Sequence, residues 1–253
     1  MFNKQILGVH KKTTTIGVLL ELGKTPIHLE AVKFAIKNWE RIKQNSGNEL
    51  LCLSYQDAIK HSLMCVTSIR ELLNKNGMLT FFMEIPPSNK YFIHKRLYQV
   101  LVDNFHQNAL CEIQRVDSKL HYYSKFKTVC GTEQYMNKVN NMQHRIALSR
   151  FRLSCHKLNI EIGRYTRIPR EERYCPFCPN SVEDENHFLF KCAQYTVERN
   201  LLLQTVQSIT PSFQFYTQEI KLTYLMTREE TINQVAKFIF KAFEDRERFH
   251  PLR

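Results

Sequence analysis

Apolar residues recur along the chain at spacings of three and four, the period at which side chains share one face of an α-helix. One stripe follows Pro26 and consists of Val32, Ala35, Ile36, Trp39 and Ile42. Two others consist of Ile93, Leu97, Val100, Leu101 and Phe105, and of Ile232, Val235, Ala236, Ile239 and Phe243. Each stripe is assigned to packing in a core, including Trp39, the only tryptophan. The sequence therefore predicts a mainly α-helical chain made of helical bundle segments.

Few residues interrupt this pattern, because the chain contains only seven glycines. Gly77 and the run Pro86-Pro87-Ser88-Asn89 predict a break before the second stripe, and Thr210-Pro211 predicts the end of a later helix. We divide the chain into four predicted parts: a helical region 1–85, a helical connector 86–141, a basic and metal-binding region 142–210, and C-terminal helices 211–253.

Length and composition are those of a globular protein. With 253 residues, 43% of them hydrophobic, the chain can bury a core. Its net charge of +12 favours a polyanionic partner such as nucleic acid. No apolar run has the length of a secretory signal or a membrane span, which predicts an intracellular protein of the nucleus or cytoplasm with no membrane partner. Thiols stay reduced there, so cysteines grouped with histidine indicate metal binding rather than disulfides.

One such group lies in the run YCPFCPNSVEDENHFLFKC, where Cys175, Cys178, His187 and Cys192 form the pattern C-x2-C-x8-H-x4-C. Three thiolates and an imidazole are ligands of tetrahedral structural zinc sites, and two ligand pairs in a short loop can supply them. The alternative is ordinary buried cysteines, or a redox pair, with an unrelated histidine. Because four protein ligands leave no position for water, the predicted Zn2+ is structural and organises a small CCHC module near the C-terminus.

A helix is predicted next to this motif. The residues spaced as one helix side are Phe188, Cys192, Tyr195, Arg199, Leu202 and Val206. His187 and Cys192 are five residues apart, about 140° around an ideal helix, so both cannot point directly at one ion from undistorted helical positions. We expect His187 at or before the first turn and Cys192 inside the helix.

Basic residues precede the motif. Between Arg145 and Arg173 the chain has eight basic and only three acidic residues. The basic ones are Arg145, Arg150, Arg152, Lys157, Arg164, Arg167, Arg170 and Arg173. Arginine binds phosphate through two parallel hydrogen bonds and stacks on bases, so these residues predict a nucleic-acid-binding face. The alternative is a solvated loop that offsets the negative charge of three thiolates and one Zn2+, with Arg173 and Lys191 beside the motif.

The first part of this basic stretch is predicted to be a helix over residues 139–155. Met142, Ile146 and Leu153 form one apolar side of it. Leu148 and Phe151 fall on other faces, so the helix either packs on two sides or presents Phe151 for stacking on bases. Packing is the preferred interpretation.

An acidic triplet, Glu183-Asp184-Glu185, lies inside the motif. Adjacent carboxylates suggest a divalent metal site, but their place just before the predicted helix fits N-capping and a favourable interaction with the helix dipole. We assign the triplet to capping and not to catalysis.

Residues 149–199 carry a pattern shared with a known family. Its elements are Arg150-x-Arg152, His156-x-Leu158, Glu161, Gly163-Arg164, Arg173, the acidic triplet, His187-Phe188-Leu189, Cys192, Tyr195 and Glu198-Arg199. With them, the segment resembles the C-terminal zinc-binding region of reverse transcriptases from LINE-type (non-LTR) retrotransposons. The run from Ile6 to Ile42 looks like the segment that follows the polymerase thumb in jockey-like elements. The middle of the chain resembles the family only loosely.

The resemblance implies a tail that helps a reverse transcriptase to grip nucleic acid, with the CCHC residues as zinc ligands. It does not extend to a polymerase, because a polymerase site needs paired aspartates and no two aspartates are adjacent in the chain. We expect no endonuclease portion either. We therefore expect a zinc-stabilised protein, not an enzyme, that binds RNA or single-stranded DNA with low sequence specificity. The remainder of a reverse transcriptase is a further candidate partner. Two alternatives stay open: a zinc-braced module that docks on proteins, and a decayed retroelement copy without selected function.

Overall fold

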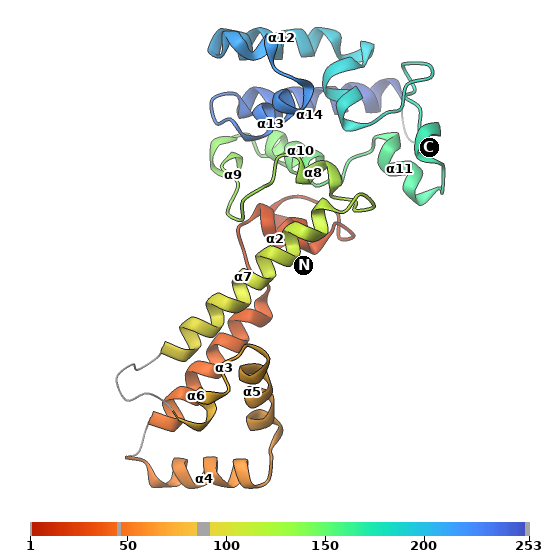
Figure 1. Ribbon diagram of the computed structural model, residues 1–253. Helices are drawn as coiled ribbons and strands as arrows, with labels where there is room; N and C mark the ends of the chain where they lie inside the picture. The colour runs from red at the N-terminus through yellow and green to blue at the C-terminus, as the bar shows by residue number, and fades with distance from the viewer. Residues whose placement is uncertain (1, 45–46, 85–91, 251–253) are drawn as a thin grey trace. The chain divides into compact units, whose positions relative to one another are not determined.

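The computed structural model describes residues 2–44, 47–84 and 92–250 (Figure 1). Over these ranges the chain is mainly helical and contains no strand, with isolated bridges between Leu22 and Thr132 and between Tyr174 and Val182. The predicted fold class is therefore confirmed. None of the described helices combines the length and apolar character needed to cross a membrane.

The helices are α1 (Phe2–Ile6), α2 (Thr15–Glu21), α3 (Ile27–Gln44), α4 (Glu49–Lys60), α5 (Met64–Lys75), α6 (Thr80–Met83), α7 (Phe92–Gln114), α8 (His121–Ser124), α9 (Tyr135–Lys138), α10 (Met142–Arg152), α11 (Asn159–Tyr165), α12 (Thr196–Ile209), α13 (Gln218–Thr227) and α14 (Ile232–Phe249). The three apolar stripes fall on α3, α7 and α14.

The predicted breaks concern Gly77, Pro86–Asn89 and Pro211. Gly77 lies in the turn after α5 with a φ of +67°, a left-handed conformation that glycine adopts readily, so the chain breaks there as predicted. The predicted break at Pro86–Asn89 lies outside the described residues. α12 ends at Ile209, before Pro211, as predicted.

The chain forms two compact units. Unit 1 comprises Met1–Lys24 and Ala109–Arg253, and unit 2 comprises Thr25–Asn108. This grouping differs from the four predicted parts, because contacts between segments far apart in the sequence decide it. The N-terminal residues pack with the C-terminal half, and turn residues alone cannot reveal such a pairing.

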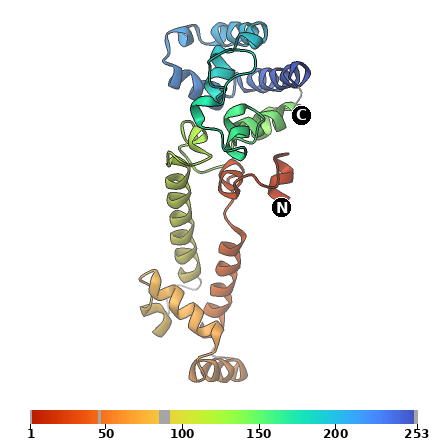
Figure 2. The same cartoon turned by 90° about the vertical axis from the view of Figure 1, so that its right-hand side faces the viewer.

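In unit 2, α3 and the first part of α7 lie side by side (Figure 1, Figure 2). The core contains Ile36 and Trp39 of α3, Leu73 of α5, and Ile93 and Leu97 of α7. Two of the predicted stripes therefore meet in one core, and the packing role assigned to the tryptophan is confirmed.

Unit 1 is organised around α14, which packs against α9, α10, α12 and α13 (Figure 1). Its buried face includes Val235, Ala236 and Ile239, which confirms the third stripe. In α10, Leu148 and Phe151 are fully buried, so this helix packs on two sides as preferred. The helix is shorter than predicted and begins after Asn141, whose side chain accepts hydrogen bonds from the first turn.

A buried arginine joins three parts of unit 1. Arg152, at the end of α10, forms ion pairs with Glu21 of α2 and with Glu133. It also donates a hydrogen bond to the carbonyl oxygen of Met226 in α13, and Tyr123 donates its hydroxyl to Glu21. Burial alone would lower the pKa of Arg152, but the two carboxylates outweigh burial and raise it. Arg152 therefore stays charged in the core.

Replacing Arg152 with methionine leaves the buried carboxylate of Glu21 without its cation, while Glu133 keeps its ion pair with Lys127. We expect Arg152→Met to lower the free energy of unfolding by about 3–5 kcal/mol, the usual cost of breaking a buried ion pair. Urea denaturation followed by circular dichroism measures the change. Arg248→Met is the matched control, because the Arg248 side chain is 71% exposed on α14. The control should change stability by less than about 0.5 kcal/mol, and equal effects of the two substitutions would contradict the assigned role.

Candidate metal centre

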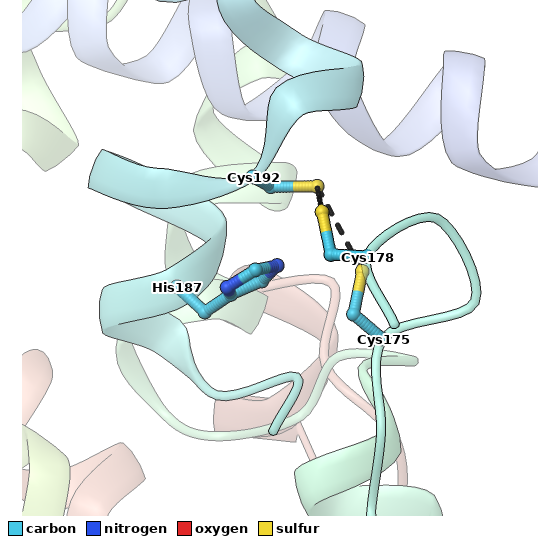
Figure 3. A group of neighbouring side chains, drawn as sticks. All are labelled: Cys175, Cys178, His187 and Cys192. Carbon is cyan, nitrogen blue, oxygen red and sulfur yellow. Dashed lines mark hydrogen bonds between the residues drawn. The ribbon is translucent and has the colours of Figure 1, made fainter. Parts of the chain in front are cut away.

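The side chains of Cys175, Cys178, His187 and Cys192 converge on one point (Figure 3). Their four ligand atoms lie within 4.8 Å of one another. Cys178 is half-buried and the other three residues are buried. The residues predicted as ligands thus form one cluster that could hold a metal ion.

The Cys175 and Cys178 thiols come from a tight turn that is held at its base. The backbone NH of Cys175 donates to the carbonyl oxygen of Ser181 at 2.7 Å, and the residues flanking the turn form an antiparallel bridge. Asn180 closes the turn with a φ of +59°, a left-handed conformation that asparagine tolerates better than most residues. The chain therefore folds back on itself, and both sulfur atoms face His187 and Cys192 (Figure 3).

A π-helical turn over His187–Lys191 supplies the other two ligands. In a π-helix the hydrogen bond joins residues five apart, and the Cys192 NH donates to the His187 carbonyl oxygen at 2.8 Å. This wider turn brings both residues to the same side, whereas an α-helix would set them about 140° apart. Cys192 follows the end of the turn, and α12 begins only at Thr196. The predicted position of Cys192 inside a helix is therefore wrong.

The distances between sulfur atoms match those around a tetrahedral metal ion. Cys192 Sγ lies 3.8 Å from Cys175 Sγ and 3.7 Å from Cys178 Sγ. Metal–sulfur bonds of about 2.3 Å at tetrahedral angles place sulfur atoms about 3.8 Å apart, whereas a disulfide requires about 2.0 Å. Nε2 of His187 is buried and has no hydrogen-bond partner in the described part of the chain, which ligation of a metal would satisfy. The donor set and its geometry fit a metal ion.

Sulfur atoms this close cannot ionise independently. The hydrogen bond between Cys175 and Cys192 lowers the pKa of Cys175 and raises that of Cys192, because one sulfur carries the charge while the other keeps the proton. A divalent cation favours the thiolate form of every cysteine that it contacts. Ionisation of this cluster and binding of a cation are therefore coupled.

Arg199 of α12 holds the carbonyl end of the π-helical turn. Its guanidinium donates to the carbonyl oxygens of Leu189 at 2.8 Å and Cys192 at 2.6 Å. Burial lowers the pKa of Arg199, and the nearby cysteine sulfurs oppose that shift. A buried cation next to the cluster offsets part of the thiolate charge, a role that the sequence suggested for Arg173 and Lys191. This role of Arg199 was not identified from the sequence, because its spacing assigned the residue to one side of a helix together with apolar residues.

The acidic triplet has three separate roles. Asp184 accepts a hydrogen bond from the NH that opens the π-helical turn, which confirms capping for this residue. Glu183 instead forms an ion pair with Arg246 of α14 through two hydrogen bonds of 2.8 Å. Glu185 is buried against His156 at 3.3 Å. The predicted capping of the helix that follows is thus wrong for Glu183 and Glu185, which fasten the metal-binding loop to α14 and to the segment before α11. The Glu183 carboxylate instead accepts the NH of Asn159, the first residue of α11, at 2.6 Å.

Two of the eight basic residues predicted to bind nucleic acid have structural roles instead. Arg152 lies in the core with no exposed surface, so the prediction is wrong for this residue. Arg173 packs on Gly163, and its guanidinium donates to the carbonyl oxygens of Ile160 and Ile168. These contacts fix the segment between α11 and the cysteines.

The other six basic residues are exposed or half-buried. Arg145 and Arg150 donate to backbone carbonyl groups, while Lys157 and Arg164 pair with carboxylates. Arg167 and Arg170 are exposed, and their side chains form no hydrogen bond or ion pair with any described residue. These two cations are the ones most available to an anionic partner.

Comparisons with known proteins add no family assignment. No protein-family model, no curated protein and no solved structure matches the chain. The resemblance to LINE-type reverse transcriptases therefore stays a prediction that rests on the residues quoted for it.

Removing one ligand should release the metal ion. We expect the wild-type protein to retain about one metal ion per chain after dialysis and Cys192→Ser to lose it, because Cys192 contacts both other sulfur atoms. Elemental analysis by mass spectrometry gives the stoichiometry. Cys65→Ser is the control, since Cys65 is an exposed free cysteine of α5. A Cys192→Ser protein that keeps its full metal content would disprove the assignment.

Proposed function

We propose that this chain is a zinc-stabilised nucleic-acid-binding protein. The observation that carries the proposal is the exposure of Arg167 and Arg170, unpaired among the described residues, on the loop between α11 and the metal cluster. Zinc suits this cluster best, because three thiolates and one imidazole in tetrahedral arrangement are typical ligands of zinc. Since four protein ligands fill the coordination sphere, the ion holds the loop and performs no chemistry.

The stiffness of this arginine loop supports the proposal. A Cβ atom at Gly163 would lie 2.5 Å from the Arg173 side chain, so glycine permits the close approach that anchors the loop. The Ile168 NH also donates to the Gly163 carbonyl oxygen at 3.0 Å. A loop already held in one conformation loses little entropy when its arginines bind phosphate.

The distribution of charge supports a polyanionic partner. Unit 1 contains 26 basic and 17 acidic residues, so +9 of the net charge of +12 belongs to the unit with the metal cluster. Contacts between arginine and phosphate carry no sequence information. The partner that follows is RNA or single-stranded DNA, bound with low sequence specificity.

Protein docking is a second candidate function, favoured by one observation in unit 2. α4 contributes no buried residue, and Leu50 and Leu53 on it are 76% and 54% exposed. Uncovered apolar residues on a helix are typical of a protein-binding surface. Retention on heparin and co-purifying absorbance at 260 nm favour nucleic-acid binding, and their absence favours docking.

Salt titration tests the nucleic-acid proposal. We expect the wild-type affinity for a single-stranded oligonucleotide to fall steeply with salt. The slope of log K against log salt is negative, and each phosphate contact adds about 0.7 to its magnitude. Arg167→Gln combined with Arg170→Gln should therefore reduce the magnitude of the slope by about 1.4. Fluorescence anisotropy measures both curves. Arg41→Gln combined with Arg70→Gln removes the same charge from exposed positions of α3 and α5 and should leave the slope close to that of the wild type. An unchanged slope in the Arg167 and Arg170 variant removes both residues from the interface.

Chelation tests the identity and role of the ion. The protein as purified should contain about one zinc ion, and its removal should lower the melting temperature, because structural zinc in small fingers contributes on the order of 10–16 kcal/mol. Differential scanning calorimetry follows the change. Added Zn2+ should restore the melting temperature and Mg2+ should not, since Mg2+ prefers oxygen ligands. A melting curve insensitive to chelation would exclude a stabilising metal.

A further inference from the structure

Unit 1 contains a cleft of about 1120 Å3 whose lining does not include the metal ligands. We name it the basic cleft. It is lined by the loop 8–13, one side of α10, residues 154–157, and parts of α11 and α14. All of these segments belong to unit 1, so the cleft is formed within one compact body.

Cations outnumber anions along the basic cleft. Its lining includes Lys11, Lys12, Lys119, Arg150 and Lys157 against Glu161, Glu244 and Glu247. Two of the three carboxylates, Glu161 and Glu247, already pair with neighbouring cations. Lys11 and Lys12 are exposed, and their side chains form no ion pair within the ranges that the structure describes. The cations that remain are Lys11, Lys12 and Arg150, against the single carboxylate of Glu244.

The loop that carries the two lysines is held in place. Gly8 adopts a φ of +62° and lies so close to α10 that a Cβ atom would come within 2.6 Å of a side chain there. Its carbonyl oxygen accepts a hydrogen bond of 2.7 Å from Arg150 Nε. Cys155 Sγ accepts two more, from a backbone NH and a hydroxyl of the loop. The lysine-bearing wall is thus formed before any ligand binds.

An exposed aromatic ring also lines the basic cleft. Tyr165, at the C-terminal end of α11, is 67% exposed. Lys119 Nζ lies 3.4 Å from its hydroxyl, so a cation flanks the ring. Arg167 and Arg170 follow two and five residues later, and the arginine loop therefore begins where the cleft residues end. An aromatic ring among cations suits single-stranded nucleic acid, because a base stacks on the ring while phosphates pair with the cations.

We propose that the basic cleft binds single-stranded nucleic acid, with one unpaired base stacked on Tyr165 and phosphates contacted by Lys11, Lys12 and Arg150. The inference rests on the proposed nucleic-acid function and adds to it the surface and the form of the strand. A double helix cannot bind in this way, because its bases stack on one another. Phe151, the stacking candidate in the sequence, is buried, and Tyr165 supplies an exposed ring instead.

Substitution of Tyr165 tests the stacking contact. We expect Tyr165→Ala to raise the Kd for a labelled single-stranded oligonucleotide by about 5- to 100-fold, the usual loss for one base stacked on an aromatic ring. The salt slope should stay unchanged, because no charge is removed. Tyr165→Phe keeps the ring and should bind as the wild type does. A Kd of Tyr165→Ala within twofold of the wild-type value would overturn the stacking contact.

A matched pair of double variants tests the cations. Lys11→Gln combined with Lys12→Gln should reduce the magnitude of the slope of log K against log salt by about 1.4, the contribution of two phosphate contacts. Lys60→Gln combined with Lys75→Gln removes the same charge from exposed positions of α4 and α5 and should bind like the wild type. Equal losses in the two double variants would mean that net charge governs binding, and would overturn the cleft as the site. Circular dichroism of each variant shows that it is folded.

Binding of single-stranded and duplex oligonucleotides to the wild-type protein separates failure of the cleft proposal from failure of the proposed nucleic-acid function. Preference for a single strand over a duplex of equal length supports the cleft. If single strand and duplex bind equally and the cleft variants bind as the wild type does, nucleic-acid binding stands and the cleft is not its site. If neither binds, the proposed function and the inference both fail.

Discussion

Unit 1 depends on one constraint, the pairing of charges that are buried in its core. Arg152 and Arg246 are almost fully buried; Arg152 pairs with two carboxylates and Arg246 with one, all on other segments of the chain. Because an unpaired charge in a core costs several kcal/mol, each guanidinium restricts which segments can pack together. Arg152 brings the N-terminal residues against α10 through Glu21, and Arg246 attaches the metal-binding loop to α14 through Glu183.

The metal cluster is therefore continuous with the core of unit 1 and is not an independent finger. Its loop is held by the Arg246 pair, its π-helical turn is opened by a capping aspartate, and Arg199 binds the carbonyl groups at the end of that turn. Side chains outside the ligand set thus position the ligands, as second-layer contacts do in preorganised metal sites. A segment cut out at residues 142–210 would lose α14, and with it the partner of Glu183.

The parts of this structure that were predicted correctly are those that short-range patterns encode. The stripe containing Trp39 and the spacing of the four ligands depend on neighbours within a few turns, so the sequence displays them directly. Arg152 and Arg167 look alike in the sequence, yet one is buried and the other exposed, because Glu21 lies 131 positions before Arg152 and pairs with it only in the folded chain. Tyr165 was not singled out for the same reason, since its exposure beside a cleft depends on segments far from it in the sequence.

The π-helical turn gives the spacing between His187 and Cys192 a specific meaning. Four intervening residues suit a turn in which hydrogen bonds join positions five apart, whereas three would suit an ordinary α-helical turn with bonds between positions four apart. If one residue were deleted from this spacer, an α-helical turn in place of the π-helical turn would still keep both ligands on the same side. The number of residues between these ligands therefore corresponds to the type of helix that carries them rather than to the length of a flexible loop.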